Sequence, residues 1–361
     1  FACMAQPLGR KHLRETGDSM REMVTHTSLR GVAALLVVVF HYRTMFADEV
    51  GLDKFTSFFE RSYVFVDMFF VLSGFVLSAV YVSKFEAGAS RDRFVGFYGK
   101  RVARIYPLHI ATMLVMIGLY LMKSRGDLWV LAGDVAENLA MVHAWGVSDR
   151  YVLNFPSWSI SVEWAAYLVF PFLCMFMSRA RMRVAMFLIV LGAYLYMAIA
   201  WGSLHHDERL GLVRGLPAFM LGVLVYRYRD SFQLRSGSVL SAIQFVAVLL
   251  VLVVMHFGLN DVLLIPLFAS IIVTTWEDRG LLCRILSGSW FHALGIWSYS
   301  VYMLHIPVRS VGFHVYPRVD AYLPEGYERF AFALVLMAIT ISTSALAYRY
   351  FECPARDRTQ A

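Results

Sequence analysis

Four titratable side chains that could carry out proton transfer interrupt long apolar stretches of this chain. They are His41, Asp67, Glu163 and His305. An ionisable group inside an apolar segment of membrane-spanning length is costly and usually faces a cavity or a charged partner. Because each of the four is expected in the outer half of its own segment, we expect them to converge on one site. A histidine there could act as a general base, and a carboxylate could fix its tautomer.

Each of these side chains, taken alone, also has a structural explanation. His41 could form an interhelical hydrogen bond, as polar residues in helix bundles commonly do. Asp67 and Glu163 lie near the starts of their segments, so they could cap a helix or be partly solvated. His305 precedes Pro307 by two residues and could bond a carbonyl group freed by a proline kink. The convergence of all four favours a functional site.

A second set of candidate residues, all arginines, lies at the ends of the apolar segments. They are Arg30, Arg101, Arg104 and Arg356. Guanidinium groups bind phosphate bidentately, and a spacing of three puts Arg101 and Arg104 on one helix face. Arg30 precedes His41 by eleven residues, which is about 16 Å along a helix and nearly the same face. The set suggests a phosphate site at the cytoplasmic mouth of a groove leading to His41, although the usual excess of Lys and Arg in cytoplasmic loops explains the same charges.

The composition places these residues in a membrane protein. Of 361 residues, 59% are hydrophobic and only 16% are charged, whereas soluble domains carry about 25% charged residues. Apolar runs of about 20 residues, the length that crosses a bilayer, recur along the chain. The formal net charge of +7 comes from short basic clusters between these runs, so it does not indicate nucleic-acid binding. The four cysteines are far apart, and we expect them to be free thiols and not metal ligands.

The apolar runs predict an all-α bundle of about ten transmembrane helices. The runs cover residues 29–47, 62–83, 105–122, 158–177, 183–201, 212–228, 239–257, 262–276, 292–314 and 330–350. The eighth is short and contains Pro266, and residues 127–145 suit a helix at the membrane interface. With alternating helices and a cytoplasmic N-terminus, the inner segments hold 22 Lys and Arg and the outer segments hold 11, so we expect both termini to be cytoplasmic. Omitting the eighth helix would reverse every helix after it.

Six motifs, in order along nearly the whole chain, resemble those of the acyltransferase-3 family of membrane O-acyltransferases. The first three are LRGVAALLVVVFH (29–41), similar to the family's Arg-X10-His helix, FVDMFFVLSGFVLS (65–78), and the Arg-X-X-Arg segment KRVARIYPLH (100–109). The others are the Ser-Val-Glu helix PSWSISVEWAAYLVFP (156–171), WSYSVYMLHIPV (297–308) and FECPAR (351–356). Each motif alone is degenerate, but six in order are specific.

The resemblance implies an enzyme of the bacterial inner (cell) membrane that acylates surface polysaccharide, exopolysaccharide or a lipid-linked sugar. Its donor would be a cytoplasmic acyl-CoA, commonly acetyl-CoA, and no metal is implied. Residues 1–28 would be a cytoplasmic segment, 29–351 the transmembrane acyltransferase domain and 352–361 a cytoplasmic tail. The CoA phosphates would contact the arginines, and the pantetheine arm would extend toward His41.

The mechanistic hypothesis is that His41 is the general base and Glu163 holds its tautomer, with direct transfer from the thioester to a sugar hydroxyl. An acyl-histidine intermediate is the alternative chemistry. A transporter or flippase for a lipid-linked sugar, with His and Glu as a proton relay, is the main alternative function, although no repeated halves are found. A non-catalytic sensor or assembly protein would not need titratable groups from four helices.

Overall fold

The computed structural model describes residues 23–88, 90–123, 128–147, 153–205, 210–232 and 236–357. Most of the expected 1–28 segment and the end of the 352–361 tail lie outside these ranges. The described residues form helices and turns with no β-strand, which confirms the predicted all-α class.

A helix occurs at each of the ten predicted positions. These are α1 (Val24–Arg43), α3 (Phe65–Glu86), α4 (Arg91–Lys123), α6 (Trp158–Met177), α7 (Ala180–Tyr196), α8 (Gly211–Tyr228), α9 (Gly237–His256), α10 (Leu264–Thr274), α12 (Ser289–Val319) and α13 (Glu328–Ala347). Shorter helices are α2 (Ala47–Val50), α5 (Leu128–Ala140), α11 (Leu281–Leu286) and α14 (Cys353–Asp357).

Seven helical stretches of the described chain are long and apolar enough to cross a membrane, so this is a multi-pass membrane protein. They are residues 24–43, 62–86, 91–122, 155–177, 180–201, 237–256 and 328–357. Helices α8 and α12 are not among them. The apolar segment that contains α10, Asp261–Thr274, is too short to qualify.

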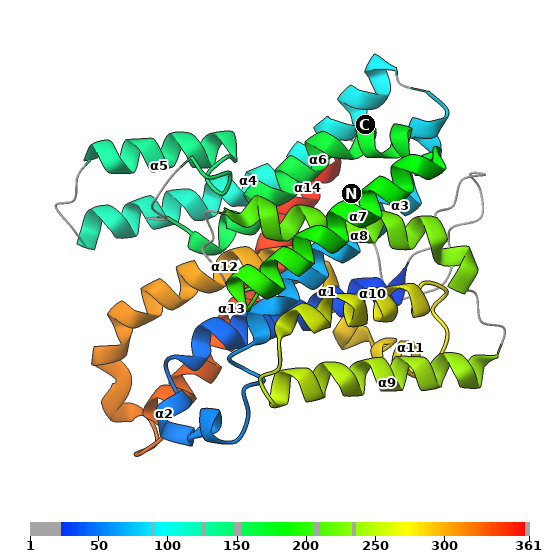
Figure 1. The fold of residues 1–361 in the computed structure, drawn as a ribbon. Helices are drawn as coiled ribbons and strands as arrows, with labels where there is room; N and C mark the ends of the chain where they lie inside the picture. The colour runs from blue at the N-terminus through cyan, green and yellow to red at the C-terminus, as the bar shows by residue number, and fades with distance from the viewer. Residues whose placement is uncertain are drawn as a thin grey trace.

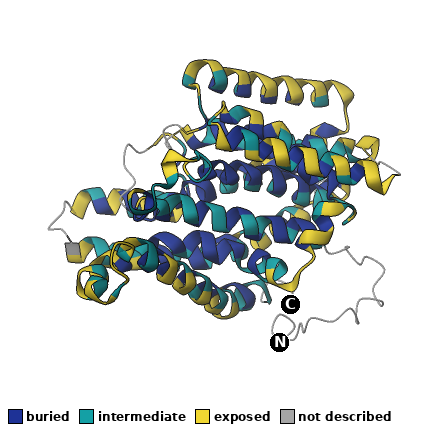
Figure 2. Ribbon diagram, turned by 90° about the horizontal axis from the view of Figure 1, so that it is seen from below, coloured by how far each residue is buried: buried dark blue, intermediate teal, exposed yellow. Residues whose placement is uncertain are grey.

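Three of these stretches lie inside the bundle and four lie outside it. Half or more of the apolar window of α1, α3 and α6 is buried, whereas a third or less is buried in α4, α7, α9 and α13. Figure 1 shows α1 in the middle of the bundle with α9 at one edge, and Figure 2 shows buried residues concentrated in the central helices. Side chains on the inner faces of the central helices therefore contact one another and not lipid.

The closest helix pairs are held together by glycines. A side-chain carbon on Gly74 of α3 would overlap the carbonyl oxygen of Phe219 on α8, and one on Gly222 of α8 would overlap that of Val71. Without a driving force from water, helices in a membrane associate through such close packing at small residues. The pair α3 and α8 is therefore joined backbone to backbone.

Helices α1 and α12 are joined in the same way. A side-chain carbon on Gly31 would lie within 3 Å of the backbone of Gly295, and one on Gly295 would overlap the carbonyl group of Thr27. This contact fixes the residue beside Gly31, which is Arg30, relative to α12.

Two further predictions about the chain differ in outcome. Cys174 and Cys283 are buried and form no disulfide bond, as predicted, but Cys353 is disulfide-bonded, so the prediction of free thiols is wrong for that residue. The 127–145 segment forms α5, which packs along α4: the ring Nε2 of His109 lies 3.0 Å from the Asn138 carbonyl oxygen.

Candidate functional site

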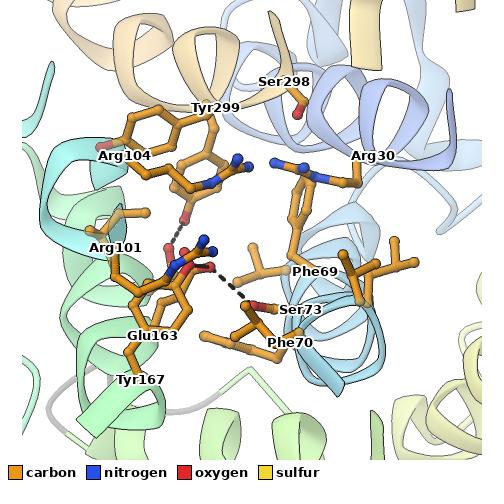
Figure 3. Close-up of a pocket in the computed structure, with 17 residues that line it drawn as sticks. Arg30, Phe69, Phe70, Ser73, Arg101, Arg104, Glu163, Tyr167, Ser298 and Tyr299 are labelled. Carbon is orange, nitrogen blue, oxygen red and sulfur yellow. Dashed lines mark hydrogen bonds between the residues drawn. The ribbon is translucent and has the colours of Figure 1, made fainter. Parts of the chain in front are cut away.

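A cavity of about 130 Å³ lies between α1, α3, α4, α6 and α12. Arg30, Arg101, Arg104 and Glu163 all line it, so the structure brings together three of the four predicted arginines and one predicted catalytic carboxylate. Figure 3 shows the guanidinium groups of Arg30 and Arg104 turned toward the space between them. The charged side chains of the lining are three arginines and one glutamate, so the cavity favours an anion.

Two of these guanidinium groups are available to a ligand. Within the described part of the chain, the side chains of Arg30 and Arg104 make no hydrogen bond and no ion pair, although both face the cavity. Arg101 is held differently, because its guanidinium carbon lies 5.5–5.7 Å from the ring centroids of Tyr81, Phe97 and Tyr167. The carboxylates of Glu163 and Glu352 attract both Arg30 and Arg104 without contacting either, so the donor hydrogens of these guanidinium groups remain available to an anion in the cavity.

Glu163 belongs to this arginine cavity. Its Oε1 accepts hydrogen bonds from the Ser73 hydroxyl at 3.1 Å and from the Tyr167 hydroxyl, one helical turn further along α6. Neither bond involves a histidine, and the side chain of His41 makes no hydrogen bond with any described residue. The prediction that Glu163 fixes the tautomer of His41 is therefore wrong.

His41 instead pairs with His305. Their ring centroids lie 5.0 Å apart with an interplanar angle of 30°, and the ring of Phe155 lies 5.1 Å from His41 on another side. His305 is completely buried, and its Nδ1 lies 2.6 Å from the carbonyl oxygen of Tyr302. That bond assigns the proton of neutral His305 to Nδ1, which leaves Nε2 as an acceptor; Nε2 has no partner in the described chain.

The arginine cavity and the histidine pair are neighbouring sites separated by a layer of side chains. The residues that line the cavity include neither His41 nor His305. They do include Tyr302, whose ring lies 5.8 Å from that of His305. The expectation of one continuous groove from Arg30 to His41 is therefore corrected to two sites that meet at Tyr302.

The same residues establish that α1 and α12 run in the same direction. Along α1, Arg30 at the cavity precedes His41 at the histidine pair. Along α12, Ser298 at the cavity precedes His305 at the pair. Seven of the ten predicted helices lie between them in sequence. A parallel course requires that an odd number of the intervening helices reverse the chain, and seven reversals, with the short α10 included, meet this requirement.

Asp67 does not join either site. Its carboxylate is fully buried and forms an ion pair with Arg214 of α8, with 2.6 Å between Asp67 Oδ2 and Arg214 Nη2 and 3.0 Å between Oδ1 and Nε. Neither residue lines the cavity. The structure does not place Asp67 beside the other predicted site residues: its charge is neutralised by a guanidinium group that ties α3 to α8, which favours the structural explanation of this residue.

Arg356 also lies outside the cavity lining. It is on α14 and contacts Tyr348. Its neighbour Glu352 is buried and accepts a 2.5 Å hydrogen bond from the Ser300 hydroxyl of α12. The segment around Glu352 and Arg356 therefore packs against α12. The geometry does not support the prediction that Arg356 binds the donor.

Several residues of the two sites were not selected from the sequence. Tyr167 and Ser73 could have been found, since each lies within one of the six motifs: Tyr167 is one turn from Glu163 on α6, and Ser73 lies in the 65–78 motif on α3. His205 gave no such signal because it follows an apolar helix in a polar loop. Its ring lies 4.5 Å from that of Tyr63, and burial, with the positive charge of Arg214, lowers its pKa.

The described residues contain no group of three or more His, Cys, Asp or Glu side chains arranged to hold a metal ion. The acid–base groups of the two sites are thus the two histidines and Glu163, with tyrosine and serine hydroxyls around them.

Sequence comparison relates this chain to known proteins. The acyltransferase-3 family, described as "Acyltransferase domain", matches residues 27–349. "Acyltransferase MdmB" of Streptomyces mycarofaciens is 31% identical over 40% of this chain and 37% of its own length. "Putative O-acetyltransferase SAS0844" of Staphylococcus aureus is 22% identical over 93% of this chain and 58% of its own length. "Putative peptidoglycan O-acetyltransferase YrhL" of Bacillus subtilis is 22% identical over 91% and 54%.

This chain spans little more than half the length of the latter two relatives. No solved structure matches it.

Proposed function

We propose that this chain, which belongs to the acyltransferase-3 family, transfers an acetyl group from acetyl-CoA to a hydroxyl group of a carbohydrate. One observation carries the proposal: two guanidinium groups that make no hydrogen bond or ion pair with any described residue face a cavity that ends at Tyr302, and Tyr302 contacts His305 of the histidine pair. An anionic donor at the arginines would present its reactive end toward His41.

The donor site suits the phosphates of CoA. A cavity of about 130 Å³ is smaller than the pockets of about 300–1,000 Å³ that enclose drug-sized ligands, so it would hold only part of the donor. Arg30 and Arg104 would bind phosphate oxygens through charge-assisted hydrogen bonds. The nucleotide would remain at the mouth, and the narrow pantetheine arm would extend along the cavity.

His41 is the group best placed to act as the base. It is only partly buried and its ring makes no hydrogen bond to the described residues, so a sugar hydroxyl can reach a ring nitrogen. As that hydroxyl oxygen attacks the thioester carbonyl carbon, His41 accepts the proton. The new C–O ester bond forms, the C–S bond breaks, and the proton passes to the thiolate of CoA. The stacked ring of His305 holds His41 in place, the role first assigned to Glu163.

We infer the membrane orientation from the charge distribution, together with the directions of α1 and α12. We place the arginine cavity toward the cytoplasm, where acyl-CoA is made, and the histidine pair toward the outside of a bacterial cell membrane. The Lys and Arg distribution supports this orientation, and the parallel course of α1 and α12 supports ten crossings with both termini inside.

The acceptor class rests on the relatives. The names of the matched Staphylococcus and Bacillus proteins refer to O-acetyl transfer, and the latter name specifies peptidoglycan. We therefore propose a cell-surface or lipid-linked glycan as acceptor. The aromatic ring of Phe155 beside His41 would face the sugar.

Thermal unfolding of the purified protein in detergent tests the donor. Acetyl-CoA should raise the unfolding temperature of the wild type and of His41→Ala, and should not do so for Arg30→Gln/Arg104→Gln. Only the wild type should transfer labelled acetyl to glycan. A wild type that acetyl-CoA does not stabilise, but that moves a lipid-linked sugar in vesicles, would overturn the proposal in favour of a transporter.

A further inference from the structure

The side chains that separate the arginine cavity from the histidine pair form a defined barrier. Phe69 of α3 and Tyr302 of α12 both line the cavity, and their rings contact each other with centroids 6.0 Å apart at 72°. Tyr302 lies against His305 on the other side. A group that moves from the arginines toward His305 and His41 meets this ring pair on the side of the cavity that Tyr302 closes.

Tyr302 is fixed in position. Its hydroxyl donates to the carbonyl oxygen of Pro156 at 2.8 Å and accepts from the hydroxyl of Ser159 at 2.7 Å. The Asn154 amide nitrogen donates to the Met303 carbonyl oxygen at 3.0 Å, which ties the start of α6 to α12 at the same level. A buried hydroxyl with two hydrogen bonds does not move without breaking them, so this half of the barrier is rigid.

Phe69 is the half that can yield. It is only partly buried, and an aromatic ring contact without hydrogen bonds holds it against Tyr302. Rotation of the Phe69 side chain away from Tyr302 would open a passage in the space that the Phe69 ring now fills. Tyr302 would still form the opposite wall of that passage.

We propose that Phe69 and Tyr302 determine which acyl groups this protein transfers, by admitting a short acyl thioester and excluding longer chains. This inference rests on the proposed function and adds the specificity of the same site. The physical reason is that an interior packed at near-crystalline density resists each additional methylene group. One methylene in a fixed apolar pocket changes kcat/KM by about 10- to 200-fold.

The test is transfer from acetyl-, butyryl- and octanoyl-CoA by the wild type and by Phe69→Ala in detergent. Phe69→Ala should raise the ratio of kcat/KM for butyryl-CoA to that for acetyl-CoA by about tenfold or more. Val76→Ala is the matched control: Val76 lines the same cavity on the same face of α3, two turns from Phe69 toward the cytoplasmic end. It should leave the ratio unchanged.

Two further variants keep the test decisive if Phe69→Ala does not fold. Phe69→Leu removes less volume and should shift the ratio in the same direction by less. Tyr302→Phe keeps the ring but removes both hydrogen bonds, so it should also favour the longer chain.

If folded variants still transfer acetyl while the chain-length ratio stays at the wild-type value, the barrier does not select the acyl group, and the proposed function survives. If the wild type neither binds nor uses any acyl-CoA, the proposed function itself fails, and this inference fails with it.

Discussion

The imidazole rings of His41 and His305 stack 5.0 Å apart on two parallel helices, α1 and α12. The sequence separates these residues by more than 260 positions, and their contact is the best evidence that both contribute to one reaction centre. Because the Nδ1 of His305 is engaged by the Tyr302 carbonyl oxygen, His305 is oriented by the backbone of its own helix. Among the described residues, the His41 ring contacts the rings of Phe40, Phe155 and His305 and makes no hydrogen bond, so its orientation depends on these neighbours.

We predict that His41→Ala lowers acetyl transfer by about 10²- to 10⁴-fold, the usual contribution of a general base. His305→Phe keeps an aromatic ring against His41 and should cause a smaller loss. Transfer of labelled acetyl to glycan measures both. Equal unfolding temperatures of wild type and variants would show that the loss is chemical. Full activity of folded His41→Ala would remove His41 from the mechanism.

Arg30→Gln and Arg104→Gln should each weaken CoA binding by about tenfold or more, since a hydrogen bond to a charged group contributes about 1.5–3 kcal/mol. Titration calorimetry with CoA measures the affinity. Arg227→Gln is the control, because Arg227 pairs with Glu86 at 2.9 Å on a partly exposed surface and should contribute little. Equal losses in all three variants would indicate a general charge effect and would contradict a specific site.

Asp67→Asn should destabilise the protein by about 3–5 kcal/mol, because it leaves Arg214 buried without its counter-ion. The activity of the folded fraction should stay near the wild-type value. Asp67→Leu/Arg214→Met, which removes both charges, should recover part of the lost stability. Unfolding temperature and activity per folded molecule separate this structural role from the catalytic one: a stable, inactive Asp67→Asn protein would restore Asp67 to the reaction.

Gly74→Ala and Gly222→Ala should each reduce the yield of folded protein, because the added carbon overlaps a carbonyl group of the facing helix. Gly192→Ala is the control, since no atom lies within 4 Å of the added carbon there. Size-exclusion chromatography after heating measures the folded fraction. Similar profiles for all three would mean that α3 and α8 are not in direct backbone contact.

His143 should make stability depend on pH. It lies outside the membrane-spanning segments, and burial, together with nearby His109, lowers its pKa to about 4 from the ordinary 6.5. Between these values the unfolded chain binds the proton more readily than the folded one. Stability should therefore be greatest above about pH 6.5 and decrease as the pH falls toward 4. His143→Gln should weaken this dependence, as measured by unfolding temperature against pH, and an unchanged profile would exclude His143 as its source.

The elements of this fold could be predicted from sequence because apolar runs and basic clusters report directly on a membrane environment. The helix positions and the arginine set of α1 and α4 agree with the prediction for that reason. Depth along a helix was harder to predict. Glu163 lies eight residues beyond Phe155 on its chain, and the structure puts Phe155 at His41 and Glu163 at the arginines.

The role of Asp67 was missed because its partner, Arg214, lies on a helix 147 residues away. Nothing local distinguishes a carboxylate that pairs with a buried guanidinium group from one that handles protons. The reliable signal was a second charge in an apolar run, GLVRGLPAF, which the structure shows to be the other half of the pair. Buried opposite charges on different spans are better considered together before either is assigned to catalysis.

The backbone contact at Gly31 and Gly295 has a mechanical consequence. Because α1 and α12 touch there without intervening side chains, the distance between their axes is set by the two backbones, and each helix carries one residue of the imidazole stack about two to three turns further on. The distance between Arg30 and the histidine pair is thereby fixed by the two helices. The flexible arm of a donor must match that distance. A larger residue at Gly31 or Gly295 would push α1 and α12 apart and would displace both Arg30 and the histidine pair.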